Sequence, residues 1–375
     1  MMMQYFATVA RGLEAIAAEE LRSLGAESVE PTFTGVSFEG DQELLYRVNL
    51  WARIPFRILV RLFQCSCWTA DDLYNGIQRV DWSRYLQPHN TLAVRATGKN
   101  RHLNHTHYTA LQVKNALVDQ QRAQFGWRSS VDTQNPDVAI NVHIRDNWAT
   151  VSLDSSGESL HRRGYRPAVG EAPLKETFAA ALLDLAEWTP DLPLLDPMCG
   201  SGTFLLEGAL KSLNIAPGLF RDRFAFESWP DFDQDLWNRL RNQAIDDQRL
   251  ELKAPIHGSD HDGFVLSEAQ TNAIEAGVDQ QIHLQQQAFE EISAIADHGI
   301  LVCNPPYGER LGDAQQLGAF YKQMGDIFKQ RFKGWTAFVL SGNPALAKRI
   351  GLRPSRRMVV YNGAIECRWL KYELF

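Results

Sequence analysis

The sequence has few cysteines and lacks any long apolar segment. Its five cysteines show no paired C-x-x-C spacing, so neither a zinc site nor a thioredoxin-like motif is expected, and we predict buried, reduced thiols. Apolar runs such as 300–303 are far shorter than the roughly 20 residues of a membrane-spanning helix. Residues 1–10 lack the charged and apolar regions of a secretory signal. We therefore expect a cytoplasmic protein without a membrane span.

The sequence also lacks an overall positive charge, which proteins that bind polyanions usually carry. Its net charge is −7, but residues 1–166 hold 18 Lys+Arg against 17 Asp+Glu, a net charge of +1, which leaves 20 against 28, or −8, for the remainder. Residues 82–118 contain no acidic residue, although five Lys or Arg and four His occur there. On charge alone, this stretch is best interpreted as a solvated face. His102, His105 and His107 have no cysteine or carboxylate partner at ligand spacing, so no metal is expected.

The first 155 residues alternate strand and helix patterns. Apolar residues recur at helical spacing between Leu13 and Leu24, and Gly25 is suited to end that helix. Two alternating segments, 138–144 and 149–153, flank a turn at Asp146-Asn147 and predict a β-hairpin. Other segments expected to be regular are strands at 5–9 and 91–97 and a helix at 108–125. The pattern predicts a small α+β module.

After the basic, linker-like segment 161–167, the pattern changes to alternating helices and apolar strands, which is typical of a parallel α/β sheet. The predicted strands are 192–195, 256–258, 282–286, 300–303 and 336–340. Asn362-Gly363 predicts a hairpin turn that closes one edge of this sheet with an antiparallel pair. An insertion over 216–254, with Trp229 and Trp237, indicates no function by itself.

A glycine-rich turn follows the strand ending at Asp196, and a helix begins near Thr203. Ligands of open α/β sheets bind at the carboxyl ends of strands, where Gly200 and Gly202 would let the backbone approach a ligand. The spacing fits neither a P-loop nor G-x-G-x-x-G. Asp260, after the next strand, is the candidate acceptor for two ribose hydroxyls, and Asp262 is expected to cap a helix.

The second element, Asn304-Pro305-Pro306-Tyr307, directly follows the strand 300–303. The two prolines stiffen the turn, so the Asn304 side chain and the Pro305 carbonyl offer fixed acceptors for an –NH2 group. Tyr307 offers a flat face for a base removed from its stack. Alone, either element would be an ordinary turn, but both follow strands of one sheet, in an order that suits a nucleoside cofactor and an amine substrate.

With these motifs the sequence resembles class I methyltransferases that carry the Asn-Pro-Pro-Tyr motif, and in particular the RlmL-type 23S rRNA guanine-N2 methyltransferases. The resemblance extends over nearly the whole chain and rests on the runs 11–14, 161–166, 172–177, 195–203 and 304–311. It implies a Rossmann-like methyltransferase sheet at 172–375, a ferredoxin-like segment at 1–50, a THUMP RNA-binding domain at 51–155 and a linker at 156–171. Some relatives carry a second methyltransferase domain beyond the first.

The resemblance also implies a set of functional residues and S-adenosylmethionine as the cofactor. Many relatives have an aspartate for the cofactor adenine where this chain has Gln287, so that contact is expected from Gln287, Phe289 or the backbone. Lys175, Glu176 and Thr177 either cap a helix or contact the methionine end of the cofactor. Catalysis is expected from Asn304, Pro305 and Tyr307; cofactor binding from Asp196, Met198, Cys199, Gly200, Ser201, Gly202, Thr203, Asp260, Gln287 and Asn304; and RNA binding from Lys99, Arg101, Lys114, Arg162, Arg163 and Arg166.

The expected reaction is methylation of the N2 amine of a guanine in 23S rRNA. The alternatives are methylation of guanine N2 or adenine N6 in transfer RNA, methylation of a protein glutamine, and a non-catalytic RNA-binding or ribosome-assembly factor. An RNA-binding module argues against the protein substrate. The intact glycine turn and Asn304 argue against the non-catalytic factor.

Overall fold

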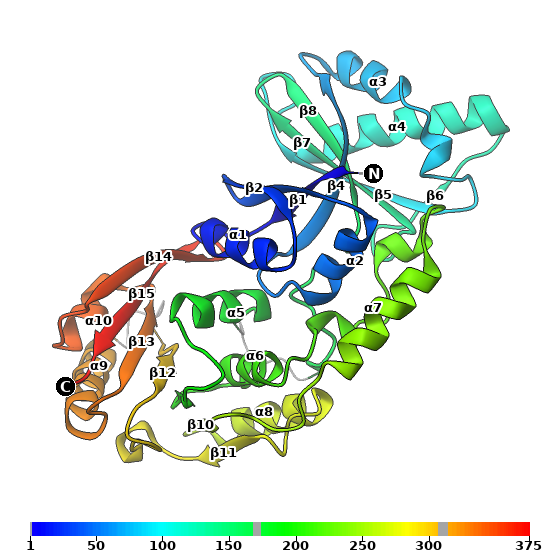
Figure 1. The fold of residues 1–375 in the computed structure, drawn as a ribbon. Coiled ribbons are helices and arrows are strands. Elements are labelled where there is room, and N and C mark those ends of the chain that lie inside the picture. Colours follow the sequence, from blue (N-terminus) through cyan, green and yellow to red (C-terminus); the bar gives the residue numbers. More distant parts are fainter. Residues whose placement is uncertain (1, 168–173, 307–313) are drawn as a thin grey trace.

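The computed structural model describes residues 2–167, 174–306 and 314–375 (Figure 1). Its N-terminal part is built on one eight-stranded sheet in the order β2-β3-β1-β4-β8-β7-β5-β6. The strands are β1 (Met3–Thr8), β2 (Glu27–Thr32), β3 (Gly35–Gly40), β4 (Arg57–Ser66), β5 (Thr91–Gly98), β6 (Ser130–Val131), β7 (Val138–Arg145) and β8 (Trp148–Asp154). The helices are α1 (Glu14–Ser23), α2 (Gln42–Trp51), α3 (Ala70–Gln78) and α4 (Thr106–Phe125). The predicted hairpin is therefore the pair β7–β8, which joins the N-terminal strands in one continuous sheet.

The side chains of β7 alternate between a covered face and an open face of this sheet. Val138, Ile140 and Val142 are almost fully buried, on the face where α4 packs against β5 and α3 against β4. Successive side chains of a strand point to opposite faces, so Asn141 and His143 lie on the other face. That second face is partly exposed around His143 and Arg145.

The second sheet has seven strands in the order β11-β10-β9-β12-β13-β15-β14. Its strands are β9 (Leu194–Asp196), β10 (Ile256–Asp260), β11 (Ile282–Gln286), β12 (Ile300–Cys303), β13 (Thr336–Ser341), β14 (Arg356–Asn362) and β15 (Ile365–Glu373). Pairing is parallel from β11 through β13, and β15 runs antiparallel to both β13 and β14. This confirms the predicted parallel sheet closed by an antiparallel hairpin, although the strand expected at 192–195 begins only at Leu194.

Helices connect these strands, as the sequence pattern predicts. They are α5 (Glu176–Leu185), α6 (Thr203–Ser212), α7 (Gln234–Asp246), α8 (Gly263–Glu275), α9 (Ala314–Arg331) and α10 (Pro344–Arg349). Over the described ranges, no helix combines the length and apolar character that a membrane crossing requires. Four of the five cysteines are buried, and Cys65 is half-buried.

The insertion at 216–254 joins the two parts of the molecule. It contains α7, which packs on α2 of the N-terminal part (Figure 1). The Tyr46 ring of α2 stacks on Phe226 with centroids 4.5 Å apart and meets the edge of Trp237 at 5.9 Å. The Tyr46 hydroxyl accepts a hydrogen bond from the Asp233 amide at 2.9 Å. The insertion thus connects α2 of the N-terminal part to the second part of the molecule, a role that its sequence did not indicate.

A buried ion pair forms a second joint between the two parts. The Arg163 guanidinium lies 3.2 Å from Glu207 Oε2 on α6, with each side chain at most 1% exposed. It also donates to the backbone carbonyls of Leu160 and Arg53, and the Tyr165 hydroxyl donates to Glu207 at 2.8 Å. Because a buried charge is stable only when paired and hydrogen-bonded, these contacts fix the segment after β8 against α6.

A third contact joins the loop before α1 to the edge strand β14. Gly12 has a positive φ of 88°, and a Cβ atom placed on it would lie 2.7 Å from the Val359 carbonyl oxygen. Next to it, the Arg11 guanidinium lies over the Tyr361 ring, 4.5 Å from its centroid. Only glycine fits this contact, because any side chain would meet the backbone of β14.

Candidate functional site

The glycine turn lies at the carboxyl end of β9, which is flanked by β10 and β12 within the parallel part of the sheet. Gly200 and Gly202 have positive φ angles of 55° and 83°, and Gly202 is the N-cap of α6. A Cβ on Gly202 would also lie 3.2 Å from Ala269 of α8. The turn therefore requires glycine, and it directs the free N–H groups of the first turn of α6 toward the strand ends.

Asp196 is a buried carboxyl group at the end of β9. It is 2% exposed, and its Oδ1 accepts a hydrogen bond from the Met198 amide at 3.1 Å. Burial, together with the nearby charge of Asp260, raises the pKa of Asp196 to about 8. The groups that shift the Asp196 pKa include no described cation, so a positively charged ligand could pair with this carboxyl group.

Asp260, at the end of β10, borders the same turn. Its Oδ2 accepts a hydrogen bond from the Gly200 amide at 3.0 Å, and its Oδ1 accepts one from the Asp262 amide at 3.1 Å. His261 Nδ1 also lies 3.2 Å from Oδ1, so the acceptor capacity that remains for a hydroxyl group is mainly that of Oδ2. Asp262 accepts from the Phe264 amide, which confirms it as the cap of α8.

Asn304 directly follows β12, and β12 pairs with β9 in parallel. The Asn304 and Gly200 turns therefore leave adjacent strands at the same edge of the sheet. Asn304 Oδ1 is buried without a hydrogen-bond partner among the described residues, and a buried acceptor without a donor is costly. Such an acceptor is suited to a donor that arrives with a ligand. Tyr307 lies outside the described residues.

Arg166 lies beside the glycine turn rather than on an RNA-facing surface, which corrects its expected role. Its Nη1 donates to the Leu174 carbonyl and to Glu176 Oε1, at 3.0 and 3.2 Å, and its Nη2 donates to the Ser201 hydroxyl. The side chain is 7% exposed. Its Nε and Thr177 Oγ1 are buried without partners in the described part of the chain. The basic segment thus reaches the glycine turn directly.

Arg163 is the second correction. Its guanidinium is buried against Glu207, where no phosphate reaches it, so it is a structural residue rather than an RNA ligand. Its neighbour Arg162 is exposed and pairs with Glu158 at 2.6 Å. Lys99 and Arg101 are exposed on the N-terminal part, and Lys114 is half-buried with its Nζ 2.5 Å from Asn115 Oδ1.

The remaining candidates line or support the turn. The Gln287 amide donates to the Asp260 carbonyl, and its side chain donates to the Glu291 carbonyl at 3.1 Å. Phe289 is buried among aromatic rings, so it presents no free face to a base. The Cys199 amide donates to the Ser259 carbonyl, and burial raises the pKa of its thiol well above the ordinary value. Cys199 is therefore a buried thiol, as expected of the cysteines, and not a nucleophile.

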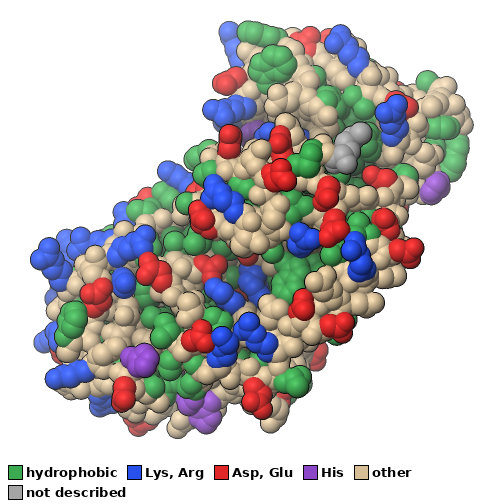
Figure 2. Space-filling model, viewed as in Figure 1, with side chains coloured by type: hydrophobic (Ala, Val, Ile, Leu, Met, Phe, Trp, Pro, Cys, Tyr) green, Lys and Arg blue, Asp and Glu red, His purple; other side chains and the backbone are tan. Residues whose placement is uncertain are grey.

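The second half of the chain also has a basic surface near its C-terminal end. The net charge of that half, which is negative, gave no sign of it. Residues 327–365 contain no Asp or Glu, although the region after residue 166 is acidic overall. Figure 2 shows Lys and Arg side chains gathered at the lower left, over α10 and β14. The exposed cations of α10 and β14 and of the segment between them are Lys348, Arg349, Arg353, Arg356 and Arg357.

Three family models match the chain. The model described as an RMKL-like methyltransferase domain matches residues 163–371, the THUMP domain model matches 67–154, and the RlmL ferredoxin-like domain model matches 4–59. These matches and the fold confirm the Rossmann-like methyltransferase sheet preceded by a ferredoxin-like and THUMP region.

Known proteins are similar over the full length of the chain. A Synechocystis protein named as a candidate RNA methyltransferase is 58% identical over 99% of this chain and 97% of its own length. The ribosomal RNA large subunit methyltransferase K/L of Methylococcus capsulatus is 43% identical, but the chain spans only 52% of its length. The crystal structure of SMU.472, named as a candidate methyltransferase complexed with SAH, is 32% identical with a TM-score of 0.90, covering 100% of this chain and 98% of that one.

Proposed function

Because the chain belongs to the RMKL-like methyltransferase family, we propose that it methylates the exocyclic N2 amine of a guanine in 23S ribosomal RNA. The observation that carries the proposal is the buried Asn304 Oδ1 without a donor, at the edge of the sheet that it shares with the glycine turn. The proposal also implies a cytoplasmic protein.

S-adenosylmethionine is the cofactor of this family fold, and the residues at the turn fit it. Asp196 is a buried carboxyl group without a cation, which suits a positively charged ligand. Asp260 retains acceptor capacity for ribose hydroxyls, and Arg166 Nε and Thr177 Oγ1 are buried groups that a polar ligand could satisfy. When bound, the cofactor supplies an already activated methyl group, so the protein must mainly orient the amine toward it.

Asn304 and Pro305 perform that orientation in the proposed reaction. The Asn304 side-chain oxygen and the Pro305 carbonyl accept the two N–H groups of the guanine amine. As the new bond to nitrogen formed and the sulfur–methyl bond of the cofactor broke, positive charge would grow on the amine nitrogen, and both acceptors would stabilise it until one N–H proton was lost to water. Tyr307 stacks on the base in this proposal. A guanine inside a duplex would first have to leave its stack.

RNA as the substrate is supported by the N-terminal part and by the surface charge. The THUMP match lies within the predicted RNA-binding domain at 51–155. Lys99, Arg101 and Arg162 are exposed, as phosphate contacts require. The basic surface over α10 and β14 gives this acidic chain a second site for a polyanion. We also propose boundaries at residues 50, 155 and 171, which separate the ferredoxin-like segment, the THUMP domain, the linker and the methyltransferase domain.

The test uses RNA from a strain that lacks the protein. Ribosomal and transfer RNA from that strain are incubated with the full chain and tritiated S-adenosylmethionine, and the labelled nucleosides are identified. Label in N2-methylguanosine of 23S rRNA is the expected result, with RNA from the parent strain as the saturated control. Label in N6-methyladenosine or in transfer RNA would contradict the proposed specificity.

A further inference from the structure

The open face of the N-terminal sheet carries cations and an exposed tryptophan. Strand pairing aligns Ser66, Arg145 and Trp148 at one end of this face, because directly opposed residues point the same way. The same rule puts His143 of β7 on this face, two residues before Arg145. It also puts Arg61 of β4 there, since Arg61 pairs with Ser152 of β8. It is the face opposite α3 and α4, and Ser66, His143, Arg145 and Trp148 are exposed on it.

His143 lies between strand neighbours that carry positive charge. The Thr97 hydroxyl lies 2.9 Å from His143 Nδ1. Burial, and then the charges of Arg145 and Arg61, lower the pKa of His143. Arg61 also lies over the Phe6 ring of β1, 5.4 Å from its centroid. The positive charge of this face therefore comes from Arg61 and Arg145, with the His143 imidazole near both.

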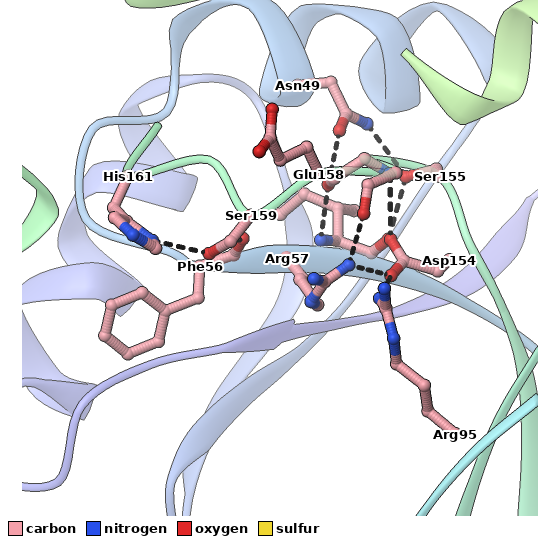
Figure 3. A network of polar contacts seen from close by, with 12 residues as sticks. Asn49, Phe56, Arg57, Arg95, Asp154, Ser155, Glu158, Ser159 and His161 are labelled. Atoms are coloured by element: carbon pink, nitrogen blue, oxygen red, sulfur yellow. Dashed lines mark hydrogen bonds and ion pairs between the residues drawn. The ribbon is translucent and has the colours of Figure 1, made fainter. Parts of the chain in front are cut away.

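One carboxylate shares this face of the four strands β4, β8, β7 and β5, and it is already neutralised. Asp154 is 3% exposed, and the guanidinium groups of Arg57 and Arg95 both pair with it (Figure 3). Among the described residues of these strands, no acidic side chain on this face remains unpaired. The exposed surface is thus complementary to an anion.

Trp148 adds an exposed aromatic ring to this charged face. It is 56% exposed, although tryptophan is usually highly buried, and it stands beside Arg145. A second exposed tryptophan, Trp68, follows the end of β4, where the Cys67 amide donates to the Asn147 carbonyl. A flat aromatic ring beside an arginine is the pattern with which sheets stack unpaired bases while cations hold the backbone.

We propose that this face, defined by Arg61, His143, Arg145 and Trp148, binds an unpaired segment of the RNA substrate by stacking a base on Trp148. The inference rests on the proposed function, since it names where the same RNA is held. Duplex RNA has its bases stacked internally and offers no free base to the ring, so the face prefers single-stranded RNA.

The test measures binding of two fluorescein-labelled probes, single-stranded oligouridine and an RNA duplex of equal length, by anisotropy. Trp148→Ala is expected to weaken oligouridine binding by roughly 5- to 150-fold, the range for losing one stacked base. Trp127→Ala is the matched control, since Trp127 is 55% exposed in the same domain but follows α4. Arg145→Gln should reduce the slope of log Kd against log salt by about 0.7, whereas Arg122→Gln on α4 should not.

Binding of S-adenosylmethionine by each variant, measured by calorimetry, verifies that the fold is intact. Equal oligouridine affinity for Trp148→Ala and Trp127→Ala, or tighter binding of the duplex, would overturn the inference. If the wild type methylates RNA and Trp148→Ala binds it normally, this surface is wrong while the proposed function stands. If the wild type methylates no RNA, the proposed function fails, and the oligouridine measurement still decides the surface.

Discussion

The Gly200 amide donates a hydrogen bond to Asp260 Oδ2 at 3.0 Å, across 60 residues of sequence. This contact ties the glycine turn after β9 to the end of β10, so both sides of the proposed cofactor site are already connected. Asp196 is buried beside them, and in the proposed function it pairs with the positive charge of the cofactor. The proposed reaction places the amine acceptor, Asn304, at the end of the neighbouring strand β12.

Asn304→Ala should abolish turnover and leave cofactor binding nearly unchanged. Removing one acceptor that acts in the transition state should cost about 2.7–4 kcal/mol, by analogy with oxyanion-hole donors, which is roughly 100- to 1000-fold in kcat. Methylation rates and the Kd for S-adenosylmethionine are measured on the same preparation. Loss of cofactor binding together with activity, in a folded variant, would contradict the role of Asn304.

Binding of S-adenosylmethionine should release a proton below about pH 8. Burial raises the pKa of Asp196 to about 8, and a cationic ligand favours the ionised carboxylate. Affinity should therefore rise between pH 6 and 8, by at most about tenfold per pH unit, and then level off. Calorimetry in buffers of different ionisation enthalpy counts the proton, and Asp196→Asn should lose the pH dependence. Wild-type affinity that is constant across this range would exclude the linkage.

The same shift has the opposite effect on stability. Because the pKa of Asp196 is above its ordinary value of 3.8, the folded chain binds a proton that the unfolded chain lacks between about pH 4 and 8. The contribution of Asp196 to the free energy of unfolding is present below that range and is lost as the pH rises through 8. Urea denaturation without cofactor should show a smaller pH-dependent loss in Asp196→Asn than in the wild type.

Arg166→Met should weaken S-adenosylmethionine binding by about tenfold or more, because a charged hydrogen bond that holds Ser201 is worth about 1.5–3 kcal/mol. Ser201→Ala removes the same contact from the other side. A double-mutant cycle separates this positioning role from general destabilisation, since partners in one contact show non-additive effects. Strictly additive losses of affinity would mean that the Arg166–Ser201 contact does not position the turn.

Arg163→Met should destabilise the protein by about 3–5 kcal/mol, since it removes the nearest cation of the buried Glu207 carboxylate and leaves only Arg53 at 3.9 Å. Arg162→Met is the matched control: its exposed pair with Glu158 is worth about 1 kcal/mol or less. Urea denaturation midpoints provide the comparison. Equal midpoints for the two variants would show that the buried pair contributes little.

Gly12→Ala should cost more free energy of unfolding than Gly126→Ala. Both glycines have positive φ angles, 88° and 79°, so alanine at either position pays about 1–2 kcal/mol for the left-handed conformation. Only the Cβ at position 12 meets an obstacle, the Val359 carbonyl oxygen at 2.7 Å; nothing lies within 4 Å at position 126. A difference near zero in chemical denaturation would mean that the loop moves away from β14.

The sequence predicted the elements whose signals are local. The strands 256–258, 282–286 and 300–303 are apolar runs with turns at their ends, and each is a strand in the structure. The Asn362-Gly363 hairpin was predicted for the same reason. Asp196, Gly200 and Asp260 lie together because parallel strands bring their carboxyl ends to one edge, which the order of motifs already implied.

The errors concern residues whose partners are distant in sequence. Arg163 and Arg166 were expected on an RNA surface because they lie in a basic segment. Their partners, Glu207 and Ser201, are 44 and 35 residues away, and no local pattern reveals such a pairing. The role of the insertion at 216–254 could not be predicted for the same reason, since its Trp237 packs on Tyr46 of the N-terminal part. The absence of acidic residues from 327–365 can be read from the sequence. It was missed because the net charge was taken over the whole second half of the chain.

The joint between Arg163 and Glu207 limits how the protein can be divided for expression. A fragment consisting of residues 172–375 would keep Glu207 on α6 but lose Arg163, Tyr165 and Arg53, which surround it. It would also expose the aromatic rings of the insertion that now cover Tyr46. The catalytic half, cut free at its apparent linker, is therefore a poor candidate for a stand-alone enzyme, and crystallisation or engineering should start from the undivided chain.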